Sequence, residues 1–289
     1  MARNVYGLDL GSYEIKVYDK KKDSIWKEKD VIALKKENEI FAVGDDAFLM
    51  HEKAPSNIEV VFPMKEGVIS RFHDMQFLLQ NLLKKGHQFA RGSEYVVAVP
   101  TDVTEVEKKA FFDLVIHSTA RAKEVNIVER SIADAIGLNL DVQNTKGVFI
   151  VNFGGQTTEL SVIAEGGMVM NRLMKVGGNT FDQSVINLVR HSHDFLIGSH
   201  TAEVLRKNFG IFTSEIESML TVAGRDLITG VPMRKGISIT LVRLAMKDPL
   251  LQCVGAIQSL LDRTPPGSTQ GHQRERYFPD GRRCAHCGA

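Results

Sequence analysis

The chain has 289 residues, of which 43% are hydrophobic and 25% charged, so it has the composition of an ordinary globular protein and room for two lobes. Its formal net charge of +1 argues against nucleic acid as a partner, because nucleic-acid-binding proteins usually carry a concentrated basic excess. No run approaches the roughly eighteen consecutive apolar residues of a membrane span, and a reducing cytoplasm is the expected compartment.

The first half of the chain alternates short strand patterns with amphipathic helical patterns. Residues 5–10 form an apolar run that ends at Gly11-Ser12, and residues 14–18 then alternate polar and apolar side chains as a half-buried strand does. Together they predict a β-hairpin. The further elements predicted in this half are strands at 31–34, 40–43, 95–99 and 126–128 and helices at 75–84, 104–120 and 131–138.

At Gly147 the pattern starts again. A strand at 148–151, a turn rich in glycine and threonine, and a strand at 160–163 repeat the arrangement of the N-terminus. This internal similarity indicates a duplication that produced two related lobes. The remaining elements predicted are a strand at 169–176, helices at 180–191 and 202–209, a hairpin at 220–229, and a helix at 239–261 in which Pro249 is a candidate break.

Two glycine turns are candidates for binding phosphate. A phosphate chain needs several convergent N–H donors and a close approach of the backbone, which larger side chains obstruct. Gly11-Ser12 and the segment 154–158 meet that need, and a carboxylate at Asp9 would orient Mg²⁺ through the water bound to it. A single glycine turn between strands is more often only structural. Two equivalent hairpins, one opening each half, favour the phosphate interpretation.

Several motifs resemble those of the actin superfamily, and specifically those of the MreB/Mbl family of bacterial rod shape-determining proteins. The resemblance runs in order from residue 5 to residue 266. Six segments carry it: V-Y-G-L-D-L-G-S at 5–12, F-P-M-K-E-G-V-I at 62–69, V-A-V-P-T at 97–101, G-G-Q-T-T-E at 154–159, V-G-G-N-T-F-D at 176–182 and G-R-D-L-I-T-G-V-P at 224–232.

The resemblance implies an α/β, two-lobed actin-like fold built from duplicated ribonuclease-H-like units. Residues 1–146 would form the first lobe, with a small insert at about 31–73. Residues 147–266 would form the second lobe, with a small subdomain at about 182–238, and the start of a return helix. It also implies ATP or GTP with Mg²⁺, and polymerisation of the chain with itself into filaments. These would lie in the cytoplasm, at the inner face of the membrane, together with cell-wall synthesis proteins.

Carried over position by position, the resemblance implies a set of nucleotide-binding residues. Asp9 would also hold Mg²⁺ through water, and Phe89 is a candidate membrane anchor. The implied nucleotide-binding residues are Asp9, Gly11, Ser12, Asn152, Gly154, Gly155, Thr157, Thr158, Gly177, Gly178, Glu203 and Arg206.

The chain departs from the family pattern where hydrolysis would take place. Asn152 stands where the second loop begins with aspartate, and Gln156 replaces a glycine. The family also has two consecutive glutamates before a helix of small residues, and the second positions the attacking water; here Glu129 and Arg130 align with them. Arginine cannot act as a general base. We therefore expect a slow ATPase at most, the alternative being that Glu129 takes over the catalytic role.

The segment 267–289 has no apolar period and does not resemble the family. Its single C-x-x-C pair, Cys284 and Cys287, is too few ligands for a zinc site. We hypothesise that one inserted nucleotide, in nature or in sequencing, produced the segment. Codons that encode it, read with one G deleted after Pro266, give E-A-R-K-A-I-N-E-N-G-I-F-L-T-G-G-V-A-H-I, which restores the helix, strand and glycine loop of the family. The C-terminal elements of the fold would then be missing.

Two other functions remain open. One is an actin-fold ATPase that does not polymerise, of the chaperone or sugar-kinase type. A chaperone would need a further substrate-binding domain, and a sugar kinase a catalytic aspartate and a larger second lobe. The other is a non-functional truncated fragment.

Overall fold

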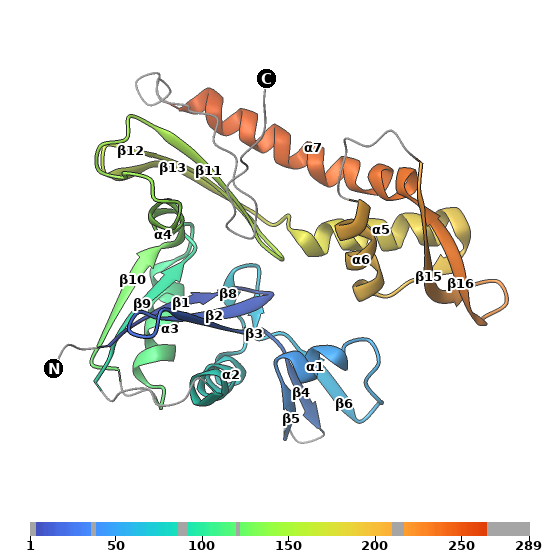
Figure 1. Ribbon diagram of the computed structural model, residues 1–289, viewed down its shortest axis with the longest axis horizontal. Helices are drawn as coiled ribbons and strands as arrows, with labels where there is room; N and C mark the ends of the chain where they lie inside the picture. The colour runs from blue at the N-terminus through green and yellow to red at the C-terminus, as the bar shows by residue number, and fades with distance from the viewer. Residues whose placement is uncertain (1–3, 36–38, 86–91, 120–121, 210–216, 265–289) are drawn as a thin grey trace. The chain divides into compact units, whose positions relative to one another are not determined.

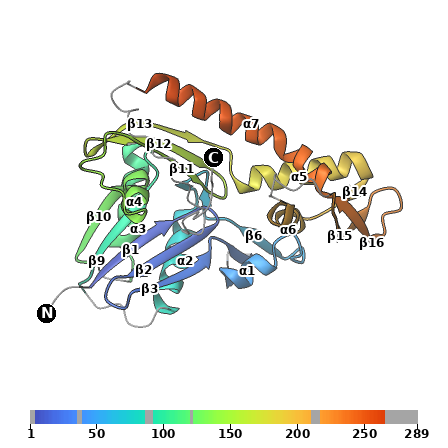
Figure 2. The same cartoon turned by 45° about the horizontal axis from the view of Figure 1, so that its top comes forward.

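The computed structural model describes residues 4–35, 39–85, 92–119, 122–209 and 217–264 (Figures 1 and 2). Its described residues fall into two compact units, which are treated separately below. Unit 1 contains the residues up to Lys175 and those from Arg263 onward. Unit 2 is Val176–Asp262. The lobe boundaries that the sequence indicates, 1–146 and 147–266, stay a prediction.

Unit 1 is built around a five-stranded sheet with the order β10-β9-β1-β2-β3. The strands β1 and β2 form the predicted hairpin, and β9 and β10 run parallel to β1. Every second residue of β1 and β2 is buried, and for β2 this is the alternation that the sequence indicates. The strands are β1 (Val5–Leu10), β2 (Glu14–Asp19), β3 (Ser24–Lys29), β9 (Glu94–Val99) and β10 (Glu124–Glu129).

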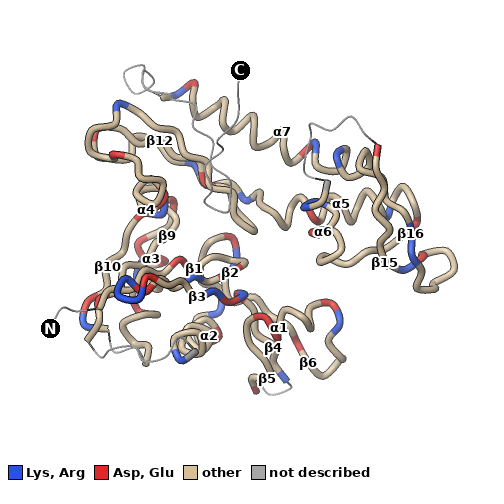
Figure 3. The backbone as a smooth tube through the Cα atoms, viewed as in Figure 1, with Lys and Arg blue, Asp and Glu red and all other residues tan. Residues whose placement is uncertain are grey.

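Three lysines, Lys20, Lys21 and Lys22, lie in the turn between β2 and β3, and all three are exposed. Figure 3 shows this basic turn beside acidic positions on the same hairpin. Asp19 accepts hydrogen bonds from the backbone N–H groups of Lys21 and Lys22, so the turn is stabilised locally.

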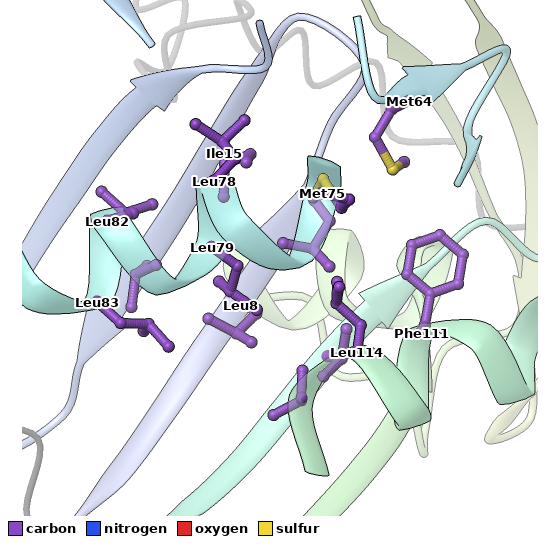
Figure 4. Packing of buried hydrophobic residues seen from close by; sticks show 14 of the residues in the cluster. Leu8, Ile15, Met64, Met75, Leu78, Leu79, Leu82, Leu83, Phe111 and Leu114 are labelled. Atoms are coloured by element: carbon purple, nitrogen blue, oxygen red, sulfur yellow. The ribbon is translucent and has the colours of Figure 1, made fainter. Parts of the chain in front are cut away.

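The helices α2 (Phe72–Lys85) and α3 (Glu105–Ile116) contact each other and supply much of the core of unit 1. Figure 4 shows leucines of α2 in one buried cluster with Leu8 of β1 and with Phe111 and Leu114 of α3. Thr104 is the N-cap of α3 and forms a capping box with Glu107. The helix predicted at 104–120 ends at Ile116.

A second sheet of unit 1 repeats the hairpin arrangement. Its order is β11-β12-β13, all antiparallel, and β12 is buried along its whole length. The short helix α4 (Arg130–Gly137) contacts β9 and β10 of the first sheet and β11 and β12 of the second. The strands are β11 (Val148–Phe153), β12 (Thr158–Ala164) and β13 (Gly167–Met174).

The remaining part of unit 1 is a group of short elements between β3 and α2. It contains a three-stranded antiparallel sheet with the order β5-β4-β6 and a two-stranded hairpin, β7-β8. These elements are β4 (Ile32–Lys35), β5 (Ile40–Val43), α1 (Asp45–Leu49), β6 (Ile58–Val61), β7 (Met64–Lys65) and β8 (Val68–Ile69).

Unit 2 combines three helices with the sheet β14-β15-β16. Pro249 lies inside α7, which continues through it, so the candidate break is absent. A proline removes one hydrogen bond inside a helix, and the buried residues on both sides of Pro249 compensate for that loss. The elements are α5 (Gly178–His193), β14 (Phe195–Leu196), α6 (Ser199–Phe209), β15 (Met219–Asp226), β16 (Pro232–Ser238) and α7 (Ile239–Arg263).

Candidate functional site

The first glycine turn joins β1 to β2. A Cβ atom added at Gly11 would lie 2.8 Å from the carbonyl oxygen of Glu14, so a larger residue cannot be accommodated without a shift of the backbone. The neighbouring Ser12 hydroxyl accepts a hydrogen bond of 3.1 Å from the N–H of Gly67. The turn therefore has the tight backbone that the sequence indicates.

The second glycine turn joins β11 to β12. The N–H of Gly154 donates to the carbonyl oxygen of Thr157 over 2.8 Å and closes the turn. A Cβ atom added at Gly155 would lie 2.7 Å from the Cβ of Tyr13, which follows the first turn. Thr157 and Thr158 are both buried. The two predicted phosphate turns therefore lie against each other within unit 1.

The hairpin β7-β8 contacts both turns. The side-chain oxygen of Gln156 accepts a hydrogen bond of 2.6 Å from the N–H of Glu66, and the adjacent N–H of Gly67 donates to Ser12. Lys175 forms an ion pair of 2.5 Å with the Glu66 carboxylate. Gln156, a departure from the family pattern, thus has a structural role that the sequence did not indicate.

Asp9 lies near the end of β1, where two basic side chains contact its carboxylate. Lys16 is directly opposite on β2, and its Nζ lies 2.9 Å from Oδ2. An Nη2 atom of Arg130 lies 3.6 Å from Oδ1. Burial acts to raise the pKa of Asp9, but the charges of Arg130 and Lys16 and the Lys16 hydrogen bond outweigh it and lower the pKa.

Arg130 is the first residue of α4, and Glu129 is the N-cap, without a side-chain capping bond. The Arg130 side chain is 13% exposed and donates a hydrogen bond of 3.3 Å to the carbonyl oxygen of Leu10. Its Nε atom is buried and has no hydrogen-bond partner within the described part of the chain. Arg130 therefore lies at the first phosphate turn, 120 residues along the sequence from Leu10.

Asn152, on β11, donates a hydrogen bond of 2.6 Å to the carboxylate of Asp134 on α4. Burial raises the pKa of Asp134 to about 6, although the Asn152 hydrogen bond and the charge of Arg130 act in the opposite direction. The side-chain amide of Asn152 therefore binds a neighbouring carboxylate, in addition to standing where the family pattern has an aspartate.

Four of the implied nucleotide-binding residues belong to unit 2. Gly177 is the N-cap of α5, and Gly178 is the first residue of that helix. Glu203 and Arg206 lie on α6, where Glu203 is buried and pairs with Lys207 over 2.6 Å. These positions lie at a helix N-terminus and along one helix, in a unit separate from the two turns.

Arg206 forms a two-point ion pair with a carboxylate of α5. Its Nε and Nη2 atoms lie 2.7 and 3.1 Å from the two oxygens of Asp182. Burial raises the pKa of Asp182 despite the favourable charge of Arg206. The pair links α5 to α6 and holds Arg206 in place.

Lys16 and Asp134, which contact the predicted site residues Asp9 and Asn152, were not found from the sequence. Lys16 could have been found from the hairpin register, which places it opposite Asp9. Asp134 had no such signal, because it meets Asn152 only through the packing of α4 on the second sheet. Phe89 and the segment 267–289 lie outside the described residues, so the membrane anchor and the reading-frame hypothesis stay predictions.

The fold is that of actin-like proteins. The structure is similar to that of MreB 5 of Spiroplasma citri bound to AMPPNP, with a TM-score of 0.86, 28% identity and coverage of 92% of this chain and 80% of that chain. The same protein bound to ADP matches equally well. The MamK double helical filament, 20% identical, shares the fold with a TM-score of 0.75 over 92% of this chain and 82% of that chain. The predicted actin-like α/β fold is confirmed.

The sequence comparisons define the family within this fold. The family model described as MreB/Mbl protein matches residues 3–271. The cell shape-determining protein MreB of Escherichia coli strain K12 is 34% identical over 275 residues, which cover 92% of this chain and 79% of that protein. The cell shape-determining protein Mbl of Bacillus subtilis strain 168 is 30% identical over 269 residues, which cover 92% of this chain and 80% of that protein. This chain belongs to the MreB/Mbl family of actin-like, cell shape-determining proteins.

Among the residues that the structure describes, no helix combines the length and the apolar character that crossing a membrane requires.

Proposed function

We propose that this chain binds a nucleoside triphosphate, ATP or GTP, between its glycine turns and assembles with copies of itself into filaments. The observation that carries the proposal is the close approach of the two turns, where a Cβ atom on Gly155 would lie 2.7 Å from Tyr13. Two adjacent tight turns can present several N–H groups to one phosphate chain. The similarity to MreB 5, solved with AMPPNP and with ADP, supports nucleotide as the ligand.

The family resemblance implies four further nucleotide-binding residues, and all four belong to unit 2. Gly177 and Gly178 begin α5, and the N–H groups at a helix start suit a phosphate oxygen. Glu203 and Arg206 on α6 would contact the nucleoside, as the family resemblance implies. The ion pair of Arg206 with Asp182 supports a positioning role, because it fixes the direction of the guanidinium.

Hydrolysis of the bound nucleotide is proposed to be slow. Arg130 occupies the position where the family pattern has the water-positioning glutamate, and its guanidinium is directed at Leu10 and Asp9. Asn152 is neutral and donates to Asp134. Glu129 precedes α4 and is the remaining candidate base. In this proposal the chain holds its nucleotide rather than consuming it.

Exchanging one glycine tests the nucleotide site. Gly155→Ala is expected to lower the affinity for ATP at least about tenfold, because the new Cβ forces the two turns apart and misplaces their N–H groups. Gly137→Ala is the matched control, since a Cβ there meets nothing within 4 Å. Titration of a fluorescent ATP analogue measures both, with thermal unfolding as a check on folding. Equal affinity of Gly155→Ala and wild type would contradict the site.

Filament assembly is proposed from membership of the family, with the inner face of the cytoplasmic membrane and the cell-wall synthesis proteins as further partners. Electron microscopy of purified protein tests the assembly. We expect straight, paired protofilaments when ATP is added and none without nucleotide. Particles that stay single at high protein concentration, while still binding ATP, would favour the alternative of a non-polymerising actin-fold ATPase.

A further inference from the structure

The family resemblance implies Mg²⁺ beside Asp9, and the residues present do not fit that ion. Both carboxylate oxygens of Asp9 already face cations, Lys16 at 2.9 Å and Arg130 at 3.6 Å. Mg²⁺ is held by oxygen ligands, usually carboxylates, with several waters retained. A divalent ion with its waters would have to enter next to the positive charges of Lys16 and Arg130, which repel it.

Asn152, where the family pattern has an aspartate, also does not attract a cation. Asn152 has no charge, and its Nδ2 group donates to Asp134 over 2.6 Å. The family pattern has an acidic residue at each of the positions of Asp9, Arg130 and Asn152. In this chain only Asp9 keeps a negative charge, because Arg130 is positive and Asn152 is neutral. Compared with the family pattern, the charge has therefore changed at two of the three positions, Arg130 and Asn152.

Arg130 is held beside the first phosphate turn. Its side chain is 13% exposed, it extends from the first turn of α4, and one of its N–H groups donates to the Leu10 carbonyl that precedes the first phosphate turn. A guanidinium has five N–H donors in a rigid plane, and it recognises phosphate by two parallel hydrogen bonds. Its Nε has no acceptor within the described part of the chain.

We propose that Arg130 replaces Mg²⁺ as the positive partner of the nucleotide phosphates, so that this chain binds nucleoside triphosphate without a divalent cation. The inference rests on the proposed nucleotide function. Lys16 supports the arrangement by neutralising Asp9, which leaves the guanidinium charge for the phosphates. An arginine at this position also explains why the chain would bind nucleotide without hydrolysing it, because a guanidinium neutralises phosphate and cannot activate water.

The test is the affinity of the full chain for ATP, measured in excess EDTA and in excess Mg²⁺. The expected dissociation constants agree within about threefold. A rise in affinity of about tenfold or more on adding Mg²⁺ would overturn the inference and leave the proposed function intact. Absence of binding under both conditions would overturn the proposed function, and the inference with it.

Variants of Arg130 sharpen the test. Arg130→Gln is expected to bind ATP at least about tenfold more weakly in EDTA, and added Mg²⁺ is expected to restore most of the loss. Arg130→Lys keeps the charge but loses the two-point geometry, so in EDTA it should bind ATP more tightly than Arg130→Gln and more weakly than wild type. Arg190→Gln, at an exposed position of α5, is the matched control and should behave as wild type. Equal losses for Arg130→Gln with and without Mg²⁺ would overturn the inference. If Arg130→Gln does not fold, the affinity of the wild type in EDTA and in Mg²⁺ still tests the inference.

Discussion

Arg130→Glu combined with Asn152→Asp is expected to raise the rate of ATP hydrolysis at least about tenfold in the presence of Mg²⁺. The double substitution returns an acidic residue to both places where the family pattern has one. It also removes the guanidinium that lies 3.6 Å from Asp9. A carboxylate that begins α4 can position water and accept its proton, and such groups contribute about 10²- to 10⁴-fold to a rate.

The two substitutions are expected to depend on each other. Asn152→Asp alone places a second carboxylate 2.6 Å from Asp134, whose pKa burial has already raised to about 6, and Asp134 then holds its proton more firmly. Arg130→Glu alone leaves the neutral Asn152 at the second loop. Release of phosphate measures all three variants against wild type. A double variant that binds Mg²⁺ and ATP but hydrolyses no faster than wild type would show that other residues block the reaction.

Asp30→Asn is expected to stabilise unit 1 at pH 8 far more than at pH 5. Asp30 is fully buried after β3, its Oδ2 accepts a hydrogen bond of 2.9 Å from the N–H of Met64, and its Oδ1 has no partner within the described part of the chain. Burial raises its pKa to about 7, against which the Met64 hydrogen bond acts only partly. Asparagine keeps the acceptor oxygen and never carries the charge.

The sign follows from the two protonation states. The unfolded chain loses the Asp30 proton near pH 4 and the folded chain only near pH 7, so stability falls across that interval as the pH rises. Between pH 5 and pH 8 the wild type should lose about 3 kcal/mol of unfolding free energy that Asp30→Asn retains. Urea unfolding followed by Trp26, the single tryptophan, measures this in unit 1.

The exposed Asp248 of α7 provides the control for this prediction, and Asp248→Asn should show no comparable pH-dependent gain. A difference between Asp30→Asn and wild type that is the same at pH 5 and pH 8 would mean that Asp30 is ionised in the folded protein across that range.

The elements that the sequence predicted are those whose signal is local. The hairpin of β1 and β2 follows from an apolar run before Gly11 and an alternating segment after it, and α3 begins at the cap that Thr104 and Glu107 form. The helix α2 begins at Phe72, earlier than the expected 75, because helix boundaries depend on packing as well as on pattern. Pro249 leaves α7 continuous, because buried residues before and after the proline support the helix.

The candidate site was less predictable, for a physical reason. Glycine turns are visible in the sequence because their residue types are dictated by the backbone. The contact of Arg130 with Asp9 joins residues far apart in the chain and depends on where α4 begins relative to β1. The buried Asp30 gave no signal either, because nothing in its neighbourhood of the sequence distinguishes it from an exposed turn residue.

The central claim is that this chain holds nucleotide without turning it over, and the release of phosphate from ATP tests it most directly. Purified wild-type protein at saturating ATP and Mg²⁺ is predicted to release phosphate at nearly the rate of a protein-free control, while ATP remains bound and intact. Turnover like that of an ordinary member of the MreB/Mbl family would contradict the claim.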